Sequence, residues 1–172
     1  MPTLMLLRHA KSSWDDAVAD RDRPLSARGR RDAGAMMPAI ARDHCPDRIL
    51  CSPARRTRET LAALLPHIGE VSDITIVDDL YEHPGDYIDV IARHGGDAER
   101  LMVIGHNPAI QETALAVAGA GDLRLRARMR AKYPTCTLAI IEFTGTWAGL
   151  QPSSGRLVAF LRPADADAAG RD

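Results

Sequence analysis

Residues 3–12, TLMLLRHAKS, give the clearest indication of the fold of this chain. Residues 3–7 form a largely apolar run, which lies between Pro2 and a group of polar residues that begins at Arg8. A short apolar run with such boundaries is typical of a strand that is buried on both faces. Strands of that kind occur mainly in parallel sheets covered by helices, so this stretch favours an α/β fold.

Similar apolar runs recur along the chain and alternate with helical patterns. The further runs are residues 48–51, 74–77, 101–104, 137–142 and 157–161, and the helical patterns are residues 26–42, 55–65, 87–93 and 108–118. Ser26 can cap the first helix, and Pro38 can kink it. The alternation predicts a three-layer α/β/α sandwich with a mostly parallel central sheet. We expect a single domain over residues 1–162 and a flexible C-terminal tail over residues 163–172, where PADADAAGRD is small and polar.

Composition excludes several functional classes. The 172 residues carry 22 Lys and Arg against 23 Asp and Glu, a net charge of −1, so no general positive field attracts nucleic acid or a membrane. Only 4% of residues are aromatic, which argues against a stacking platform for single-stranded nucleic acid. The three cysteines contain no CxxC pair, which argues against a disulfide framework and a zinc site. We therefore expect a cytoplasmic protein with no nucleic-acid or membrane partner.

Three of the predicted strands are followed by loops that carry arginine or histidine. RHAKS (residues 8–12) follows the first strand, SPARR (52–56) the second and GHNP (105–108) the fourth. Taken singly, each has an ordinary explanation, because such histidines are usually satisfied polar residues, clustered arginines usually form a solvated face, and Asn-Pro favours turns. The carboxyl ends of parallel strands meet at one rim, however, and there they form the ligand crevice. We therefore expect these side chains to share one site.

Histidine and arginine together suit phosphoryl transfer. A neutral imidazole can attack phosphorus, while arginine binds two phosphate oxygens and keeps its charge. A second histidine can donate a hydrogen bond to phosphate when the bound dianion raises its pKa. Two arginines and two histidines thus predict a phosphate pocket that uses no metal and no cofactor.

The three loops resemble the motifs of a known family. LLRHAKS resembles the RHG motif of the histidine phosphatase superfamily, SPARRTRET its second-arginine segment, and GHNP its second-histidine segment, all in the family's order over residues 6–108. The resemblance implies a phosphoglycerate mutase-like fold. It also implies that His9 is the phospho-accepting nucleophile and that Arg8, Arg56 and His106 bind the phosphate.

The resemblance selects Arg56 rather than its neighbour Arg55. The family's arginine lies four residues after a serine, here Ser52, and a threonine further along matches Thr60. Mutase-like members also take a general acid from a Glu after the third strand, which makes Glu82 the candidate acid. The alternative is that Glu82 is simply a solvated loop residue.

Further residues suggest a branch of this family. Ala10 replaces the family's glycine, and Asp15 stands where an asparagine would contact phosphate in the mutases. RHAKS, the DRDRPLSARG segment (residues 20–29) and the compact length look like the SixA branch, the protein phosphohistidine phosphatases. This implies a phosphorylated protein as the partner. The rival interpretations are a small-molecule or phospho-Ser/Thr/Tyr phosphomonoesterase with the same pocket, and a phosphate-binding module without catalysis.

The roles of two polar segments remain open. Ser12, Arg21 and Arg23 are possible secondary site residues, although the two arginines can instead pair with Asp20 and Asp22 on the surface. LRLRARMRAK, residues 123–132, carries five basic residues at alternate positions. It can steer a phosphorylated partner, but a plain solvated segment is the favoured interpretation.

Overall fold

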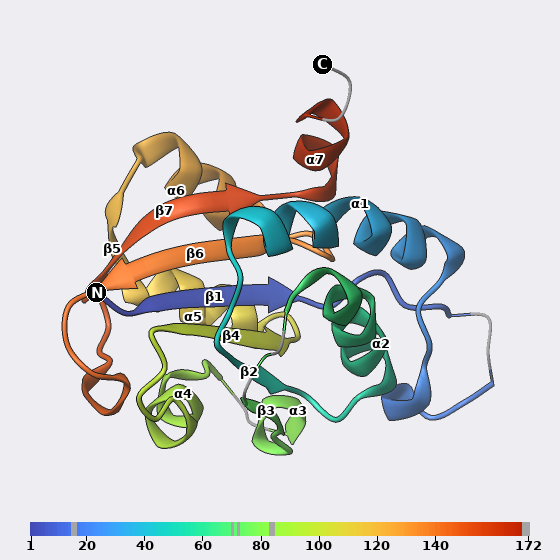
Figure 1. The fold of residues 1–172 in the computed structure, drawn as a ribbon, viewed down its shortest axis with the longest axis horizontal. Coiled ribbons are helices and arrows are strands. Elements are labelled where there is room, and N and C mark those ends of the chain that lie inside the picture. Colours follow the sequence, from blue (N-terminus) through green and yellow to red (C-terminus); the bar gives the residue numbers. More distant parts are fainter. Residues whose placement is uncertain (15–16, 70, 72, 83–84, 170–172) are drawn as a thin grey trace.

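The computed structural model describes residues 1–14, 17–69, 71, 73–82 and 85–169 as seven strands and the helices around them (Figure 1). The strands lie in one sheet in the order β3-β2-β4-β1-β6-β7-β5. β6 is antiparallel to β1 and β7, whereas the other pairings of the described sheet are parallel. The predicted mostly parallel sheet is confirmed. The strands are β1 Thr3–Arg8, β2 Arg48–Cys51, β3 Asp73–Ile76, β4 Arg100–Gly105, β5 Ala118–Gly121, β6 Leu138–Phe143 and β7 Gly155–Leu161.

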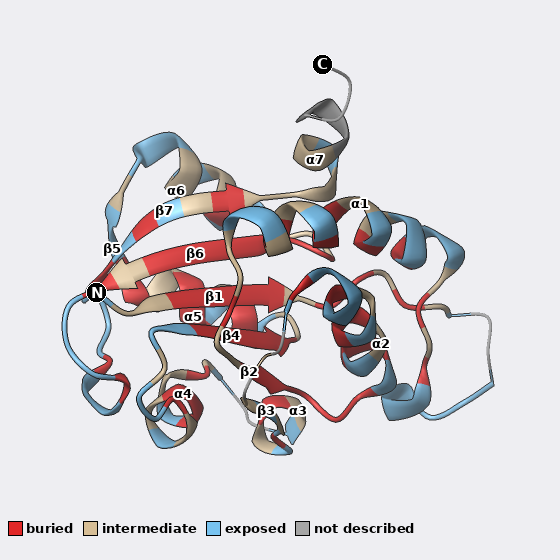
Figure 2. Ribbon diagram, viewed as in Figure 1, coloured by how far each residue is buried: buried red, intermediate tan, exposed pale blue. Residues whose placement is uncertain are grey.

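Helices cover both faces of the sheet, with α1 and α2 in front of it and α5 behind it in Figure 1. The α-helices are α1 Ala27–Asp43, α2 Arg55–Leu64, α3 Asp79–Glu82, α4 Ile88–His94, α5 Ala109–Val117, α6 Leu123–Ala131 and α7 Pro163–Ala169. The 3-10 helices are η1 Asp20–Asp22, η2 Leu65–His67 and η3 Trp147–Gly149. The strands are largely buried and the outer faces of the helices are exposed (Figure 2).

The alternation of side chains along β1 shows how the two cores form. Leu4 and Leu6 belong to the apolar cluster that contains Ile110 of α5, whereas Met5 and Leu7 belong to the cluster on the α1 and α2 side. All four β1 side chains are buried. The central strands therefore separate two apolar layers, which confirms the three-layer α/β/α arrangement.

Helix α1 begins at the predicted cap. Ser26 Oγ accepts a hydrogen bond from Gly29 N at 3.0 Å, and the helix then runs through Pro38 to Asp43. Ser26 N also donates to the Lys11 carbonyl oxygen at 2.8 Å, which ties the start of α1 to the loop after β1. Four apolar residues on one stripe are buried against the sheet, as the helical period predicts: Ala33, Met36, Met37 and Ile40.

Several elements were not predicted from the sequence, among them α3, β5, α6, α7 and the 3-10 helices. β5 consists of AGAG, which lacks the branched or aromatic residues typical of strands. The basic segment forms α6, and the expected flexible tail contains α7, where Asp165 pairs with Arg128 of α6 at 2.8 Å and with Arg162 at 3.2 Å.

In the described part of the chain, we find no helix with the length and apolar character needed to cross a bilayer.

Candidate active site

The three predicted loops meet where β1, β2 and β4 end, at the arrowheads of these strands in Figure 1. Arg8 closes β1 and His9 follows it, Ser52 follows β2, and His106 follows β4. Hydrogen bonds extend the sheet into these loops, because His9 N donates to Gly105 O at 3.1 Å and Ser52 N donates to Ile104 O at 3.0 Å. The strand ends thus hold the two histidine-bearing loops side by side, and the His9 and His106 ring centroids lie 5.2 Å apart.

The ring of His9 is buried and held in one orientation. Its side chain has a hydrogen bond of 2.7 Å between Nδ1 and the Ala10 carbonyl oxygen, and the residue is 7% exposed. A carbonyl oxygen can only accept, so the proton sits on Nδ1 and Nε2 of the neutral ring carries the lone pair. Burial lowers the pKa of His9 to about 3, the bond to Ala10 opposes this, and the charges of His106 and Arg56 add to the lowering. His9 is therefore neutral near pH 7.

His106 lies across from His9 with one ring nitrogen occupied. Its Nε2 and Ser52 Oγ share a hydrogen bond of 2.7 Å, and its backbone N donates to Tyr87 Oη at 3.2 Å. Burial and then the charge of Arg56 lower the pKa of His106 to about 4. Its Nδ1 is buried, and no hydrogen-bond partner for it exists among the residues that the structure describes. Buried polar atoms without a partner are rare in proteins, and a catalytic or ligand-binding role is one explanation for this atom.

Arg8 has a second orphaned atom in the same site. Its Nη1 donates to the Tyr133 carbonyl oxygen at 2.6 Å, which fixes the guanidinium, while its Nε is buried and lacks a partner within the described residues. Burial lowers the pKa of Arg8 below its ordinary value. A guanidinium nevertheless remains charged at neutral pH, so the site contains a fixed cation with a free donor.

Arg56 reaches the site from the first turn of α2. It is 7% exposed, and it donates from Nη1 to the Asp20 carbonyl oxygen at 2.6 Å and from Nη2 to Asp20 Oδ2 at 3.0 Å. Arg55 is exposed and instead donates to Glu59 at 2.7 Å within α2. The structure therefore places Arg56 among the candidate site residues and Arg55 on the surface.

Asp20 links several site residues and was not recognised as one of them from the sequence. Besides Arg56, it accepts from Arg23 Nη1 at 2.9 Å and from the Tyr81 hydroxyl at 3.0 Å. Partial burial raises the pKa of Asp20, but the hydrogen bonds from Arg23 and Tyr81 and the charge of Arg56 outweigh this and lower it. Asp20 is therefore a carboxylate that holds two guanidiniums together.

The secondary residues divide into an inner and an outer group. Arg23 is 7% exposed and donates from Nη2 to Ser12 Oγ at 2.7 Å, so both belong to the inner network. The Arg23 guanidinium also lies 3.3 Å from the ring centroid of Trp14, which is 73% exposed. Arg21 is on the surface and pairs with Asp78 at 3.3 Å rather than with a neighbouring aspartate.

The segment after β3 brings Tyr81, rather than Glu82, against the other site residues. The ring of Tyr81 meets that of His106 edge-on with centroids 5.7 Å apart. Glu82 is exposed, and its side chain makes no hydrogen bond or ion pair with the described residues. No spacing signal identified Tyr81, because its role depends on contacts with residues distant in the sequence. Asp15, the other position singled out by the resemblance, lies outside the described residues.

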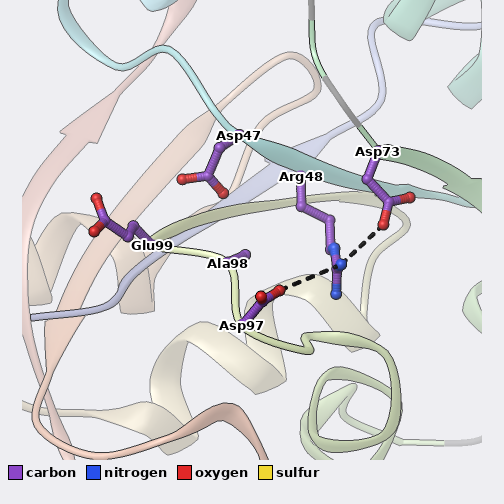
Figure 3. A pocket seen from close by; sticks show the side chains of 6 residues that line it. All are labelled: Asp47, Arg48, Asp73, Asp97, Ala98 and Glu99. Atoms are coloured by element: carbon purple, nitrogen blue, oxygen red, sulfur yellow. Dashed lines mark ion pairs between the residues drawn. The ribbon is translucent and has the colours of Figure 1, made fainter.

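A separate hollow lies at the other end of the strands from the candidate site, near the amino ends of β2, β3 and β4 (Figure 3). Its volume is about 190 Å³. Arg48 pairs there with Asp73 at 2.9 Å and with Asp97 at 3.6 Å, and it donates to the carbonyl oxygens of His94 and Gly95. These contacts join the segment before β4 to β2 and β3, so the cluster of charges in this hollow has a structural explanation.

Comparison with known proteins places this site in a family. Residues 4–89 match the family model for the histidine phosphatase superfamily, branch 1. An uncharacterized protein of Mycobacterium tuberculosis (strain ATCC 25618 / H37Rv) is 36% identical over 167 residues, which cover 91% of this chain and 99% of the relative.

Solved structures agree with this assignment. A candidate phosphohistidine phosphatase SixA from Nakamurella multipartitia superposes with a TM-score of 0.79 at 32% identity, over 94% of this chain and 96% of that one. A candidate SixA from Agrobacterium tumefaciens gives a TM-score of 0.79 at 31% identity, over 95% and 99% of the two chains. With its motifs, its fold and these matches, the chain belongs to the histidine phosphatase superfamily, and within it to the SixA-type branch.

Proposed function

We propose that this phosphatase removes the phosphoryl group from phosphohistidine on a protein, with His9 as the nucleophile. The observation that carries the proposal is the Nδ1 bond from His9 to the Ala10 carbonyl oxygen, which leaves the Nε2 lone pair for attack. The His106 ring lies 5.2 Å from that ring, and the charges of Arg56 and Arg8 act on it, so these three residues would hold the phosphate oxygens. Membership of the superfamily and the likeness to candidate SixA proteins support phosphatase activity.

The reaction would take place in two displacements. In the first, His9 Nε2 attacks phosphorus, the P–N bond to the substrate histidine breaks, and the released imidazole takes a proton from water. In the second, water attacks the phosphorylated His9, the new P–N bond breaks, and inorganic phosphate leaves with the His9 ring neutral again. Arg8 and Arg56 stabilise the charge on the phosphate oxygens in both steps.

His106 would change its protonation when phosphate binds. Its pKa of about 4 in the free site makes it neutral at pH 7. A bound dianion next to the ring favours the charged form and raises this pKa. The buried Nδ1, which has no partner among the described residues, would then donate a charge-assisted hydrogen bond to a phosphate oxygen.

The exposed position of Glu82 fits a substrate that needs no general acid, and phosphohistidine is such a substrate. The leaving nitrogen of phosphohistidine can take its proton from water, whereas the alkoxide of a phosphate ester needs a general acid. The rival activity is hydrolysis of small-molecule or Ser/Thr/Tyr phosphate esters, and its action on esters of aliphatic alcohols, such as phosphoserine, would therefore depend strongly on Glu82. Turnover of phosphohistidine would depend on it little.

The two activities separate in one panel of assays. We would measure turnover of a phosphohistidine protein, phosphoserine and phosphotyrosine peptides and p-nitrophenyl phosphate in EDTA, with wild type, His9→Ala and Glu82→Gln. We expect phosphohistidine turnover to be retained in EDTA, lost in His9→Ala and nearly unchanged in Glu82→Gln. Phosphoserine turnover that collapses in Glu82→Gln, with no turnover of phosphohistidine, would establish the rival. Full activity of His9→Ala would refute both.

A further inference from the structure

Helix α6 concentrates positive charge in a chain whose net charge is −1. Residues 123–132 carry five basic side chains and no acidic one. We call four of these the α6 basic surface: Arg124, Arg126, Arg130 and Lys132. They are exposed or half-buried in the structure.

None of these four cations forms an ion pair with the described residues, unlike several other surface arginines. In the helix, Arg128 pairs with Asp165 at 2.8 Å. The α6 basic surface forms no ion pair within the described part of the chain. By contrast, Arg42 holds Asp43 at 2.9 Å and Arg93 holds Asp79 at 2.6 Å. The surface charge of α6 is therefore available to a partner.

The fold itself does not explain this charge pattern. Arg126 and Arg130 are four residues apart and so lie on one flank of the helix, where like charges repel. Arg124 and Arg126 also lie near the helix N-terminus, where the helix dipole disfavours cations. Packing needs only Met129, which is buried, and Leu125, which lies partly buried against the core. Arg124 and Arg126 thus oppose the stability of the helix, whereas the helix dipole favours Arg130 in the last turn.

The C-terminal end of α6 is joined to the candidate active site. Gln111 Nε2 donates to the carbonyl oxygens of Met129 at 3.0 Å and Arg130 at 3.3 Å, and its Oε1 accepts from Asn107 at 3.2 Å. Asn107 directly follows His106 in the chain. The Tyr133 carbonyl oxygen, just beyond α6, accepts from Arg8 at 2.6 Å. The positive helix end therefore stands beside the loops that hold the phosphate site.

We propose that the α6 basic surface docks an acidic face of the phosphoprotein substrate. The proposal rests on the proposed function, because it names the kind of protein that brings phosphohistidine to His9. Carboxylates around the phosphorylated residue would meet Arg126, Arg130 and Lys132 while the phosphate enters the site. Such complementarity acts mainly by accelerating association and by favouring the correct partner.

The test compares two triple variants with equal loss of charge. One is Arg126→Gln, Arg130→Gln and Lys132→Gln in the α6 surface. The control is Arg42→Gln, Arg100→Gln and Arg156→Gln, near the end of α1 and the starts of β4 and β7, away from His9. The probes are phosphoramidate, a phosphohistidine peptide with four flanking Asp or Glu residues, and the same peptide with Ser in those places.

If the substrate docks on α6, the α6 variant should lose activity only towards the acidic peptide. We expect kcat/KM for that peptide to fall about tenfold in the α6 variant at low salt, and this difference to shrink as salt screens the charges. Phosphoramidate, the Ser peptide and the control variant should all keep their wild-type values. An equal loss on all probes, an equal loss in the control variant, or no loss at all would overturn the proposal.

A binding measurement keeps this inference separate from the proposed function. Fluorescence anisotropy of the labelled acidic peptide reports docking even if no phosphohistidine substrate is turned over. We expect weaker binding to the α6 variant and unchanged binding to the control. Tighter binding of a single-stranded DNA oligonucleotide than of the peptide, lost in the same variant, would assign the surface to nucleic acid and overturn the proposal. Absence of any phosphohistidine turnover by wild type, with docking intact, would refute the proposed function alone.

Discussion

The Nδ1 atom of His9 donates to the Ala10 carbonyl oxygen over 2.7 Å, and this bond governs the chemistry available to the ring. It fixes the tautomer, so the second nitrogen keeps a lone pair. Burial then keeps the ring neutral by lowering the pKa of His9 to about 3. The same burial lowers the pKa of His106 to about 4. Two neutral imidazoles inside a folded chain have a measurable consequence for stability.

We predict that these histidines make the fold less stable as the pH falls. Their ordinary pKa is 6.5, so from about pH 6.5 downward the unfolded chain binds protons that the native chain does not. The unfolding free energy should fall with pH by up to about 1.4 kcal/mol per pH unit for each such proton. Urea titrations between about pH 7 and about pH 4 measure this slope.

Replacement of one histidine separates its contribution to the pH dependence of the unfolding free energy from the contribution of the carboxylates. We expect a shallower slope in His9→Gln than in wild type. His67→Gln provides the control, because His67 lies on the surface in η2. Identical slopes in wild type and His9→Gln would show that His9 is not held neutral in the native state.

The neighbours Arg55 and Arg56 should differ sharply in their effect on turnover. Arg56 is buried and joins the site through Asp20, whereas Arg55 is exposed and pairs with Glu59. We expect Arg56→Ala to lower kcat by about 10²-fold or more, as loss of a phosphate-stabilising donor does, and Arg55→Ala to change it less than about twofold. Steady-state kinetics on phosphohistidine measure both values. The reverse order would place the wrong arginine in the site.

At the scale of elements, the start of α1 supports the loop that carries His9. A Cβ atom added at Gly29 would lie 2.1 Å from the Lys11 carbonyl oxygen and within 2.9 Å of Lys11 N. Backbone atoms cannot move aside as the end of a flexible side chain can, so the helix and the RHAKS loop must separate to admit a methyl group. The glycine in this helix therefore allows α1 to pack closely against the β1 loop.

Gly29→Ala should consequently damage both stability and turnover. We expect a loss of about 1–3 kcal/mol in unfolding free energy, typical of overpacking, together with reduced kcat on phosphohistidine. Gly34→Ala is the matched control in the same helix, because nothing lies within 4 Å of its added Cβ. That variant should keep its activity and gain about 0.5–1 kcal/mol from helix propensity. Chemical denaturation and kinetics on both variants check this, and equal behaviour would contradict the packing argument.

The elements differ in how well the sequence predicts them. Buried strands with branched residues, such as β1 and β4, are evident from composition and length alone. β5 is not, because its Ala and Gly residues carry no hydrophobic pattern and its pairing depends on β7. Helices α6 and α7 were missed because their polar and small residues give little apolar periodicity. Their positions depend on tertiary contacts, including the ion pair between Arg128 and Asp165.

At the scale of the whole molecule, the sheet topology explains which site residues could be predicted. Arg8, His9 and His106 stand at the ends of adjacent strands, so the order of motifs along the chain was enough to bring them together. Asp20 and Tyr81 could not be found in this way. Asp20 reaches Arg56 across 36 residues and Tyr81 across 61 residues of sequence, on segments with no periodic pattern. Such contacts follow only from the packing of the complete fold.

Phosphorus NMR of the trapped enzyme shows whether His9 accepts the phosphoryl group on Nε2. We would label the chain with ¹⁵N-histidine, mix it with phosphoramidate, stop the reaction within its first turnover, and locate the phosphorylated residue by mass spectrometry. We expect one phosphoryl group on His9, with phosphorus coupled to Nε2, and none in His9→Ala. A phosphoryl group on Nδ1 or on another residue, or no covalent intermediate in a turning-over enzyme, would contradict it.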